Sequence, residues 1–239
     1  MWGSQSANTQ SEVIDAADVY PTRSSATVYI VSAPTGVYVQ VIKPVIDRVV
    51  AGGVWILALP VLIGCAIAVR ISLGPNILFA QERVGRNGRR FKVYKFRTMH
   101  ADRRDHAVGE VATDFVGDDR RKTHKSADDP RLTGVGKFLR KWSLDELPQL
   151  WNVLRGDMSL IGPRPELPAI VSRYNEWEHA RHMVKPGLTG LWQVTARGAG
   201  RPMHEHVAVD VEYVAGLKAS LDLRILVQTP IALLTNRGF

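Results

Sequence analysis

The longest hydrophobic pattern in the chain covers residues 49–69, which carry no charged or strongly polar side chain. A helix of that length extends roughly 30 Å, about the thickness of the hydrocarbon core of a bilayer. The run is apolar on every helical face, so it offers no side suited to water. We therefore predict a membrane-embedded helix here, in preference to the buried central helix of a soluble fold.

The residues within and around this run leave its path through the membrane open. Pro60 lies at its middle, where it removes one helical hydrogen bond and clashes with the preceding turn. Cytoplasmic flanks favour Lys and Arg, and both flanks carry them: Lys43, Arg48, Arg70, Arg83, Arg86, Arg89 and Arg90. Cations on both sides favour a helix that enters, bends and returns. A straight span with a proline kink fits the same residues equally well.

The remaining pattern predicts short elements. Residues 1–26 are rich in small polar side chains and have no basic start, so we predict a loose tail rather than a secretory signal. Short strands are predicted at 27–31 and 37–42. The alternation of Phe91 and Val93 after a Gly-Arg-Asn-Gly turn predicts a further strand.

The second half of the chain is more polar. Residues 102–130 predict a surface loop or a weak helix, and short amphipathic helices broken by Gly and Pro follow them. The largely apolar residues 221–234 fit either the membrane interface or ordinary core packing.

Composition narrows the function classes. The formal net charge of +8 calls for an anionic partner, which can be nucleic acid, anionic lipid or a phosphorylated substrate. Charge alone does not choose among them. The single Cys65 excludes an internal disulfide and any zinc site built from several cysteines.

Two adjacent carboxylates are the first candidates for chemistry. Ser143, Asp145 and Glu146 have the S-x-x-E spacing of a capping box, which predicts a helix that begins there and continues through Leu154. Acidic residues in a first turn commonly do no more than complement the helix dipole. The pair also suits phosphate chemistry, with one carboxylate as a nucleophile and the other binding a divalent cation or handling a proton.

Attack on a phosphate also requires cations to offset repulsion, and the sequence supplies several. Arg140, Lys141 and Arg155 flank the carboxylates, and Arg164 lies between two prolines that fix its backbone. The Lys-Pro-Gly-Leu-Thr-Gly segment at 185–190 is a further candidate, because its glycines can expose backbone N–H groups to an anion. Both proline-containing segments also fit plain connecting loops.

In this order, these pieces resemble the monotopic phosphoglycosyl transferases, the bacterial sugar transferases of the undecaprenyl-phosphate type. The resemblance covers about residue 41 to the C-terminus, and the run from Asp128 to Glu166 is its most specific part. The matching strings are KPVIDRVVAGGVWILALPVLIG, FAQERVGRNGRRFKVYKFRTMHAD, DDPRLTGVGKFLRKWSLDELPQLWNVLRGDMSLIGPRPE, RHMVKPGLTGLWQVTARG and DVEYV.

The resemblance implies a mechanism. Asp145 matches the nucleophile that attacks the sugar-bearing phosphorus of a UDP-sugar and expels UMP. The phosphate of a polyprenol, such as undecaprenyl phosphate, then takes the phosphosugar from the aspartate. Glu146 matches the partner carboxylate, which is associated with Mg2+. The other matching positions are basic residues expected at the active site, a phosphate contact and a further acidic residue: Lys95, Arg164, Arg197 and Asp210.

The resemblance also implies a fold and a location. Pro60 matches the proline that breaks a re-entrant helix, which favours that path over a span. The expected fold is α+β and mostly helical, with a tail (1–40), a re-entrant membrane helix (41–72) and a small cytoplasmic catalytic domain (73–239) with amphipathic interfacial helices. The expected place is the cytoplasmic face of the bacterial inner membrane, at the first membrane step of exopolysaccharide or glycoconjugate biosynthesis.

Two departures and two rival functions stay open. Leu59 stands where many members have Ser before the proline, and Thr195-Ala196-Arg197 lacks a usual glycine. One rival is a catalytically inactive relative, and the other is a basic membrane-tethered protein for anionic lipid or nucleic acid. The sequence contains no recognisable nucleic-acid module, so no nucleic-acid partner is expected. The identity of the sugar and a homo-oligomeric state are left open.

Overall fold

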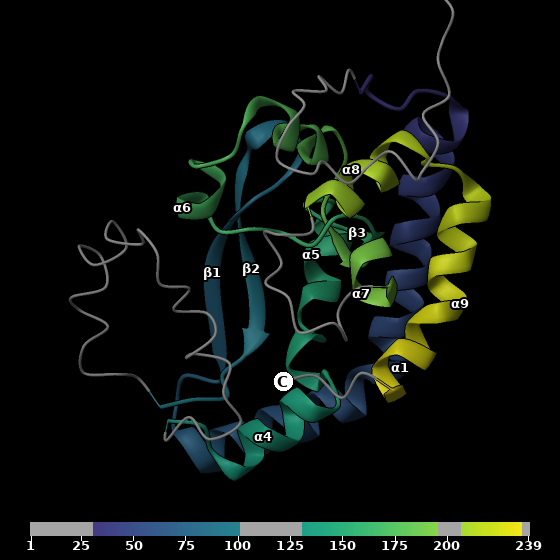
Figure 1. The fold of residues 1–239 in the computed structure, drawn as a ribbon. Coiled ribbons are helices and arrows are strands. Elements are labelled where there is room, and N and C mark those ends of the chain that lie inside the picture. The colour runs from purple at the N-terminus through teal and green to yellow at the C-terminus, as the bar shows by residue number, and fades with distance from the viewer. Residues whose placement is uncertain (1–30, 101–130, 196–206, 236–239) are drawn as a thin grey trace, which may run out of the picture. The chain divides into compact units, whose positions relative to one another are not determined.

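A computed structural model describes residues 31–100, 131–195 and 207–235 of the 239-residue chain. The described part is mostly helical with two small sheets, which agrees with the expected α+β class (Figure 1). The predictions for the tail, for the strand at 27–31 and for residues 102–130 lie outside the described residues, except for Val31.

The helices are α1 (Lys43–Leu73), α4 (Gly134–Lys141), α5 (Gln149–Arg155), α6 (Pro168–Val171), α7 (Leu191–Thr195), α8 (Val207–Ala215) and α9 (Ala219–Thr235).

Helix α1 is the predicted apolar helix, and it begins earlier than expected. A π-helical turn, Tyr38–Ile42, continues directly into it, so the strand predicted at 37–42 is wrong. The alternating valines of this segment resemble a strand, but a helical turn satisfies the backbone without a partner strand. The Gln40 N–H, for example, donates to the carbonyl of Gly36 at 3.1 Å.

Helix α1 changes direction along its length. Its first part lies beside α9 and its second part passes along α4 (Figure 1). Pro60 lies inside the helix, in sequence between the first part, which carries Lys43, and the second part, which carries Leu62 and Leu73. A proline is the usual cause of such a bend, because it removes a hydrogen bond and crowds the preceding turn. Both a re-entrant helix and a kinked span contain such a bend.

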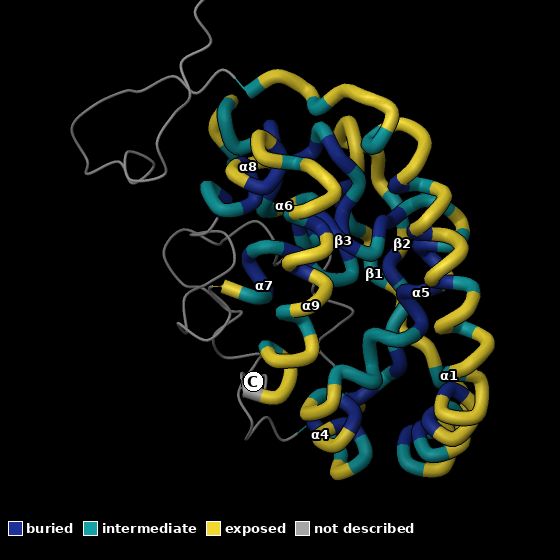
Figure 2. The backbone as a smooth tube through the Cα atoms, turned by 90° about the vertical axis from the view of Figure 1, so that its right-hand side faces the viewer, coloured by how far each residue is buried: buried dark blue, intermediate teal, exposed yellow. Residues whose placement is uncertain are grey.

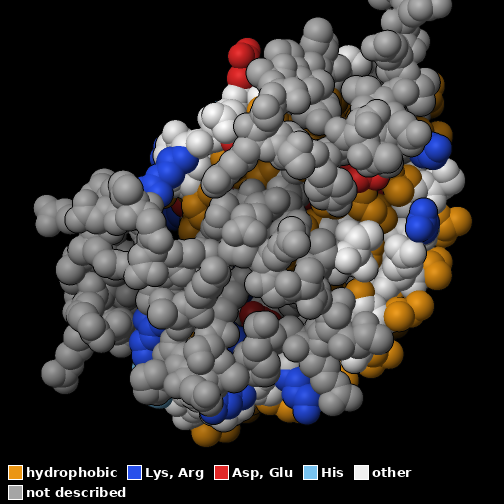
Figure 3. Space-filling view, in the orientation of Figure 1, with side chains coloured by type: hydrophobic (Ala, Val, Ile, Leu, Met, Phe, Trp, Pro, Cys, Tyr) orange, Lys and Arg blue, Asp and Glu red, His pale blue; other side chains and the backbone are white. Residues whose placement is uncertain are grey.

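The surface of α1 is apolar and largely uncovered. Within the described residues, Tyr38–Leu73 is the one helical stretch long and apolar enough to cross a membrane, and only 17% of its most apolar window is buried. Both α1 and α9 carry long stretches of exposed residues (Figure 2), and hydrophobic side chains gather along one edge of the molecule (Figure 3). The exposed large side chains of α9 are Leu223, Leu226, Val227, Ile231, Leu233 and Leu234.

The strand predicted around Phe91 and Val93 is confirmed, and it is one half of a hairpin. Strand β1 (Leu78–Val84) pairs antiparallel with β2 (Arg90–Phe96), and Gln81 lies opposite Val93. A 3-10 turn, Arg86–Gly88, connects them with Asn87 at a φ of 54°. The second sheet is a short parallel pair, β3 (Ser159–Ile161) with β4 (Gly187–Thr189).

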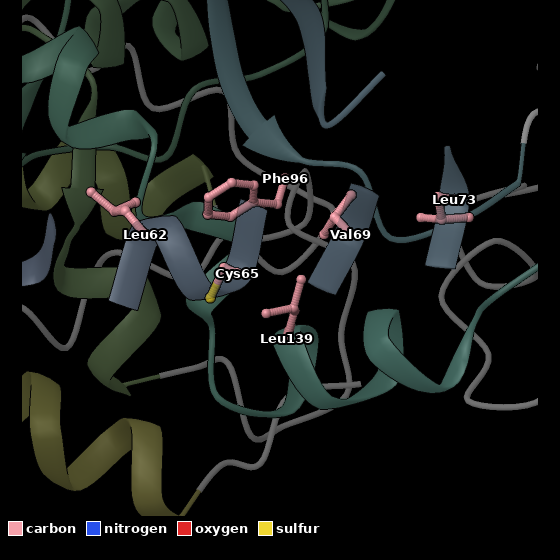
Figure 4. Packing of buried hydrophobic residues seen from close by; sticks show 6 residues of the cluster. All are labelled: Leu62, Cys65, Val69, Leu73, Phe96 and Leu139. Atoms are coloured by element: carbon pink, nitrogen blue, oxygen red, sulfur yellow. The ribbon is translucent and has the colours of Figure 1, made fainter. Parts of the chain in front are cut away.

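Two apolar clusters join α1 to the rest of the fold. In the first, Leu62, Cys65 and Val69 of α1 pack against Phe96 of β2 and Leu139 of α4 (Figure 4). In the second, Ala51 of α1 packs with side chains of β2 and α5: Val93, Leu150 and Val153. Burial of these groups stabilises the fold by roughly 25 cal/mol for each Å² removed from water. It also fixes the ends of β2 and α5, which carry the site, against the apolar helix.

Candidate active site

The two adjacent carboxylates lie in a turn between α4 and α5. Ser143 has a φ of 54° and makes no side-chain cap, so the predicted capping box is wrong. Leu144–Glu146 form a single 3-10 turn, and Pro148 is the N-cap residue of α5. Pro148 has no N–H to donate to the carbonyl of Leu144, so a continuous helix from Ser143 would lose a bond at its start.

Glu146 is clamped by two cations from distant segments. Its Oε1 accepts from Lys95 Nζ at 2.8 Å and from Arg164 Nη2 at 2.6 Å, while Arg164 Nη1 lies 3.4 Å from Oε2. All three side chains are largely buried. The structure therefore brings together three of the residues that the sequence singled out.

A buried asparagine sets the position of Lys95. Asn152 of α5 donates to the carbonyl of Lys92 at 2.7 Å and accepts from the N–H of Tyr94 at 3.2 Å. It is fully buried, so both bonds are shielded from water. Helix α5 and strand β2 are thereby held in one register, which places Lys95 beside the turn that carries Glu146. The sequence analysis missed Asn152, because nothing in its neighbourhood signals a partner so far along the chain.

The two carboxylates differ in their electrostatics. Burial opposes the charge of Glu146, but Arg164 and Lys95 hold the pKa of this carboxyl well below its ordinary value. Burial, and then the charge of Glu146, raise the pKa of Asp145 to about 6. In the described part of the chain, Asp145 takes part in no ion pair. Glu146 is thus fixed and ionised. Asp145 has no ion-pair partner among the described residues and its charged form is destabilised, as expected of a nucleophile or a proton carrier.

Of the other cations that the sequence singled out, Arg140 affects the pKa of a carboxyl group in the turn. The charge of Arg140 lowers the pKa of Asp145, although its guanidinium is hydrogen-bonded to Thr98. Arg155 pairs with Asp157 at 3.4 Å, and Lys141 lies over the ring of Trp142.

In the glycine-rich segment 185–190, the N–H of Gly187 binds another part of the fold and is not free for an anion. The Gly187 N–H donates to the carbonyl of Pro163 at 2.9 Å. A Cβ on Gly187 would lie 2.1 Å from the backbone nitrogen of Gly162, so only glycine allows this approach. The prediction that this segment presents its N–H groups to a phosphate is therefore not supported at Gly187.

Asp210 does not contact the Lys95, Glu146 and Arg164 group. Its Oδ2 lies 2.5 Å from Nη2 of Arg181, and both side chains are almost completely buried. Asp210 binds Arg181, a residue that the sequence analysis missed, and its place in the active site stays a prediction. Arg197 lies outside the described residues, and Pro60 lies within α1, with its side chain exposed.

A model of one protein family, described as bacterial sugar transferase, matches residues 38–236. The chain belongs to the bacterial sugar transferase family. The match includes α1, the hairpin, the carboxylate turn and the Gly-Pro-Arg-Pro loop, so the candidate site lies within it.

Relatives agree with this assignment. The chain is 37% identical over 226 residues to the exopolysaccharide production protein ExoY of Sinorhizobium fredii, covering 91% of this chain and 97% of that protein. It is 39% identical over 208 residues to the UDP-glucose:undecaprenyl-phosphate glucose-1-phosphate transferase of Caulobacter vibrioides, covering 84% and 72%. It is 39% identical over 198 residues to the undecaprenyl-phosphate galactose phosphotransferase of Salmonella typhimurium, covering 82% and 41%.

Other relatives are much longer than the matched region. The chain spans 37%, 41% and 42% of the length of three of them, which are a galactosyl transferase of Streptococcus agalactiae, a UDP-galactose-lipid carrier transferase of Erwinia amylovora and an uncharacterized sugar transferase of Haemophilus influenzae.

Proposed function

We propose that the chain transfers a phosphosugar from a UDP-sugar to a polyprenyl phosphate, such as undecaprenyl phosphate, with Asp145 as a covalent nucleophile. The observation that carries this proposal is the contrast within the carboxylate turn. Glu146 is fixed by Lys95 and Arg164, while Asp145 is unpaired among the described residues and has a raised pKa. The names of the Caulobacter and Salmonella relatives supply the substrate classes.

The proposed reaction has two displacements at one phosphorus atom. A carboxylate oxygen of Asp145 attacks the sugar-bearing phosphorus, an O–P bond forms, and the bond to UMP breaks with its electron pair leaving on UMP. An oxygen of the polyprenyl phosphate then attacks the same phosphorus and releases the carboxylate of Asp145. Phosphoryl transfer depends mainly on position and charge neutralisation. The proposed role of Arg164 and Lys95 is to hold Glu146 in place and offset the negative charge of the donor.

We propose Mg2+ as the cofactor. This ion typically uses one or two carboxylates and completes its shell with substrate phosphates and water. Oε1 of Glu146 is occupied by two cations. Among the described residues, Oε2 has only the long 3.4 Å contact, so it keeps acceptor capacity next to Asp145. The described residues contain no group of three or more His, Cys, Asp or Glu suited to hold a metal. The residues present therefore fit an ion shared with a diphosphate, where it would neutralise charge on the departing UMP.

We propose that α1 is re-entrant, with both ends at the cytoplasmic face of the inner membrane. Three observations support this path: the change of direction, Pro60 inside the helix, and cationic residues on both flanks. Because α1 packs on β2 and α4, this arrangement keeps the carboxylate turn near the depth of lipid headgroups. A polyprenyl phosphate presents its charge at that depth, and the exposed apolar side of α9 suits the same interface.

The pH dependence tests the assignment of the nucleophile. Only ionised Asp145 can attack, so single-turnover UMP release is expected to rise with pH through about 6 and then level. In Glu146→Gln the neighbouring negative charge is gone, so the pKa of Asp145 falls. The acidic limb of the pH–rate profile, where UMP release rises with pH, is then expected to move to lower pH. The control Glu82→Gln changes an exposed carboxyl on β1 and is expected to leave the limb in place. A limb that stays fixed or moves upward in Glu146→Gln would contradict the assignment.

The proposed activity is tested by UMP release from a panel of UDP-sugars with purified protein, short polyprenyl phosphate and Mg2+. We expect release with at least one donor, dependence on Mg2+, and formation of a polyprenyl diphosphosugar. A basic binding protein would instead show no release, and its binding to nucleic acid would weaken steeply with salt. An inactive relative would release no UMP with any donor.

A further inference from the structure

The backbone of the Gly-Pro-Arg-Pro loop is held by hydrogen bonds at every residue. The Gly162 N–H donates to the carbonyl of Thr189 at 2.9 Å, and the Gly187 N–H donates to that of Pro163 at 2.9 Å. The carbonyls of the next two residues, Arg164 and Pro165, accept from the guanidinium groups of Arg181 and Arg83 at 2.7 and 3.3 Å. The loop that carries Arg164 is thus fixed from outside, not by its prolines alone.

The bond to Arg164 comes from a deeply buried network. Nη2 of Arg181 donates both to the Arg164 carbonyl and to Asp210 Oδ2, and Nη1 donates to the Tyr174 hydroxyl at 2.6 Å. The side chains of Arg181 and Asp210 are only 1% and 2% exposed. A buried guanidinium is costly unless it is paired, so Asp210 is what allows Arg181 to stay in this place.

We propose that Arg181, held by Asp210, is a positioning residue for Arg164. Arg181 binds the Arg164 backbone, and the Arg164 side chain grips Glu146 at 2.6 Å. Loss of Arg181 frees the Arg164 carbonyl to rotate, which carries the guanidinium away from Glu146. The role rests on the proposed function, because its consequence is read in the transfer reaction. It also gives Asp210 a task that requires no contact with substrate.

A double-mutant cycle with purified full-length protein tests this role. The cycle combines Arg181→Met with Arg164→Lys and measures kcat and KM for UMP release. Misplacement of a catalytic group by a fraction of an ångström is costly, so we expect Arg181→Met to lower kcat about tenfold in the native background. If Arg181 acts through Arg164, the same change is expected to cost less than about twofold in Arg164→Lys, because coupled residues are not additive. KM for the donor is expected to change less than kcat.

Val211→Ala is the matched control. Val211 lies next to Asp210 in α8 and packs on Ala180, beside Arg181, but makes no bond to the loop. It is expected to lower the melting temperature and to have the same small effect on kcat in both backgrounds. Arg181→Lys and Asp210→Asn repeat the cycle if Arg181→Met does not fold.

The possible results distinguish a failure of the positioning role from a failure of the proposed function. An equal loss of kcat from the Arg181 variant in both backgrounds would overturn the positioning role, as would a Val211→Ala variant that behaves like it. Either result leaves the proposed function standing as long as Asp145→Asn is inactive. An active Asp145→Asn, in contrast, would remove the proposed function and leave the contacts of Arg181 intact.

Discussion

Replacing Asp145 by asparagine is expected to abolish transfer and, at the same time, to make the protein more stable. Loss of a nucleophile typically costs at least about a thousandfold in turnover. The pKa of Asp145 is raised in the fold, from 3.8 to about 6. A raised carboxyl pKa contributes stability only at low pH, and that contribution is lost as pH rises through about 6. At pH 8 the ionised side chain therefore destabilises the fold, by at most about 3 kcal/mol for the full shift and about 2 kcal/mol after allowing for its partial exposure, and asparagine removes this cost.

The measurement is turnover together with thermal unfolding at two pH values. At pH 8 we expect a gain of about 5 °C for Asp145→Asn, and near pH 4 the gain is expected to shrink, because Asp145 is then protonated. Asp157→Asn is the control, since this partly exposed carboxylate pairs with Arg155 away from the turn. A variant that is less stable at pH 8 and still turns over would show that Asp145 is a structural residue.

Replacing Arg164 by methionine is expected to give the second largest effect, with the opposite sign on stability. The change leaves the buried Glu146 carboxylate with Lys95 as its remaining cation, so the pKa of Glu146 rises. Removing one partner from a buried ion pair costs about 3 kcal/mol or more. Turnover is expected to fall at least about a hundredfold, since the charge that faces the donor is lost as well.

Adding Glu146→Gln to Arg164→Met separates the two effects. In the double variant the buried Glu146 charge that lost Arg164 is gone, but Lys95, which is partly exposed, loses its partner. Only part of the lost unfolding free energy is therefore expected to return, while turnover stays low. Thermal and denaturant unfolding measure the first quantity, and UMP release measures the second. Arg90→Met is the control, because its exposed pair with Glu82 is worth less than about 1 kcal/mol. A double variant no more stable than Arg164→Met would contradict the described role of Glu146.

The parts of the fold that follow from local pattern were predictable. The apolar run predicted α1, and the alternation of Phe91 and Val93 after the Gly-Arg-Asn-Gly turn predicted β2, although not its partner strand β1. Local pattern failed where two structures share one signature. The S-x-x-E spacing fits a capped helix and also a 3-10 turn, and Pro148 decides in favour of the turn. The valines of 37–42 fit a strand, but the helix that follows them extends backward through the segment.

The carboxylate pair and Arg164 were candidates from residue type and local setting, whereas Lys95 was predicted only through family resemblance. Lys95, Glu146 and Arg164 are far apart in sequence, and no spacing rule brings them together. Asp210 shows the limit of prediction by resemblance, because the match of its position to the family pattern did not indicate that its partner is Arg181. Such long-range buried pairs are set by the packing of α8 on the neighbouring 3-10 segment Glu176–Met183, which leaves no periodic signal in the chain.

The central claim is that a carboxylate of the turn forms a bond to phosphorus, and peptide mass spectrometry tests it most directly. The protein is incubated with an active UDP-sugar and Mg2+ without acceptor, quenched and digested. The account predicts a phosphosugar on the peptide that contains Asp145, in an amount equal to the UMP released, and its disappearance when polyprenyl phosphate is added. An unmodified Asp145, under conditions in which polyprenyl diphosphosugar still accumulates, would contradict it.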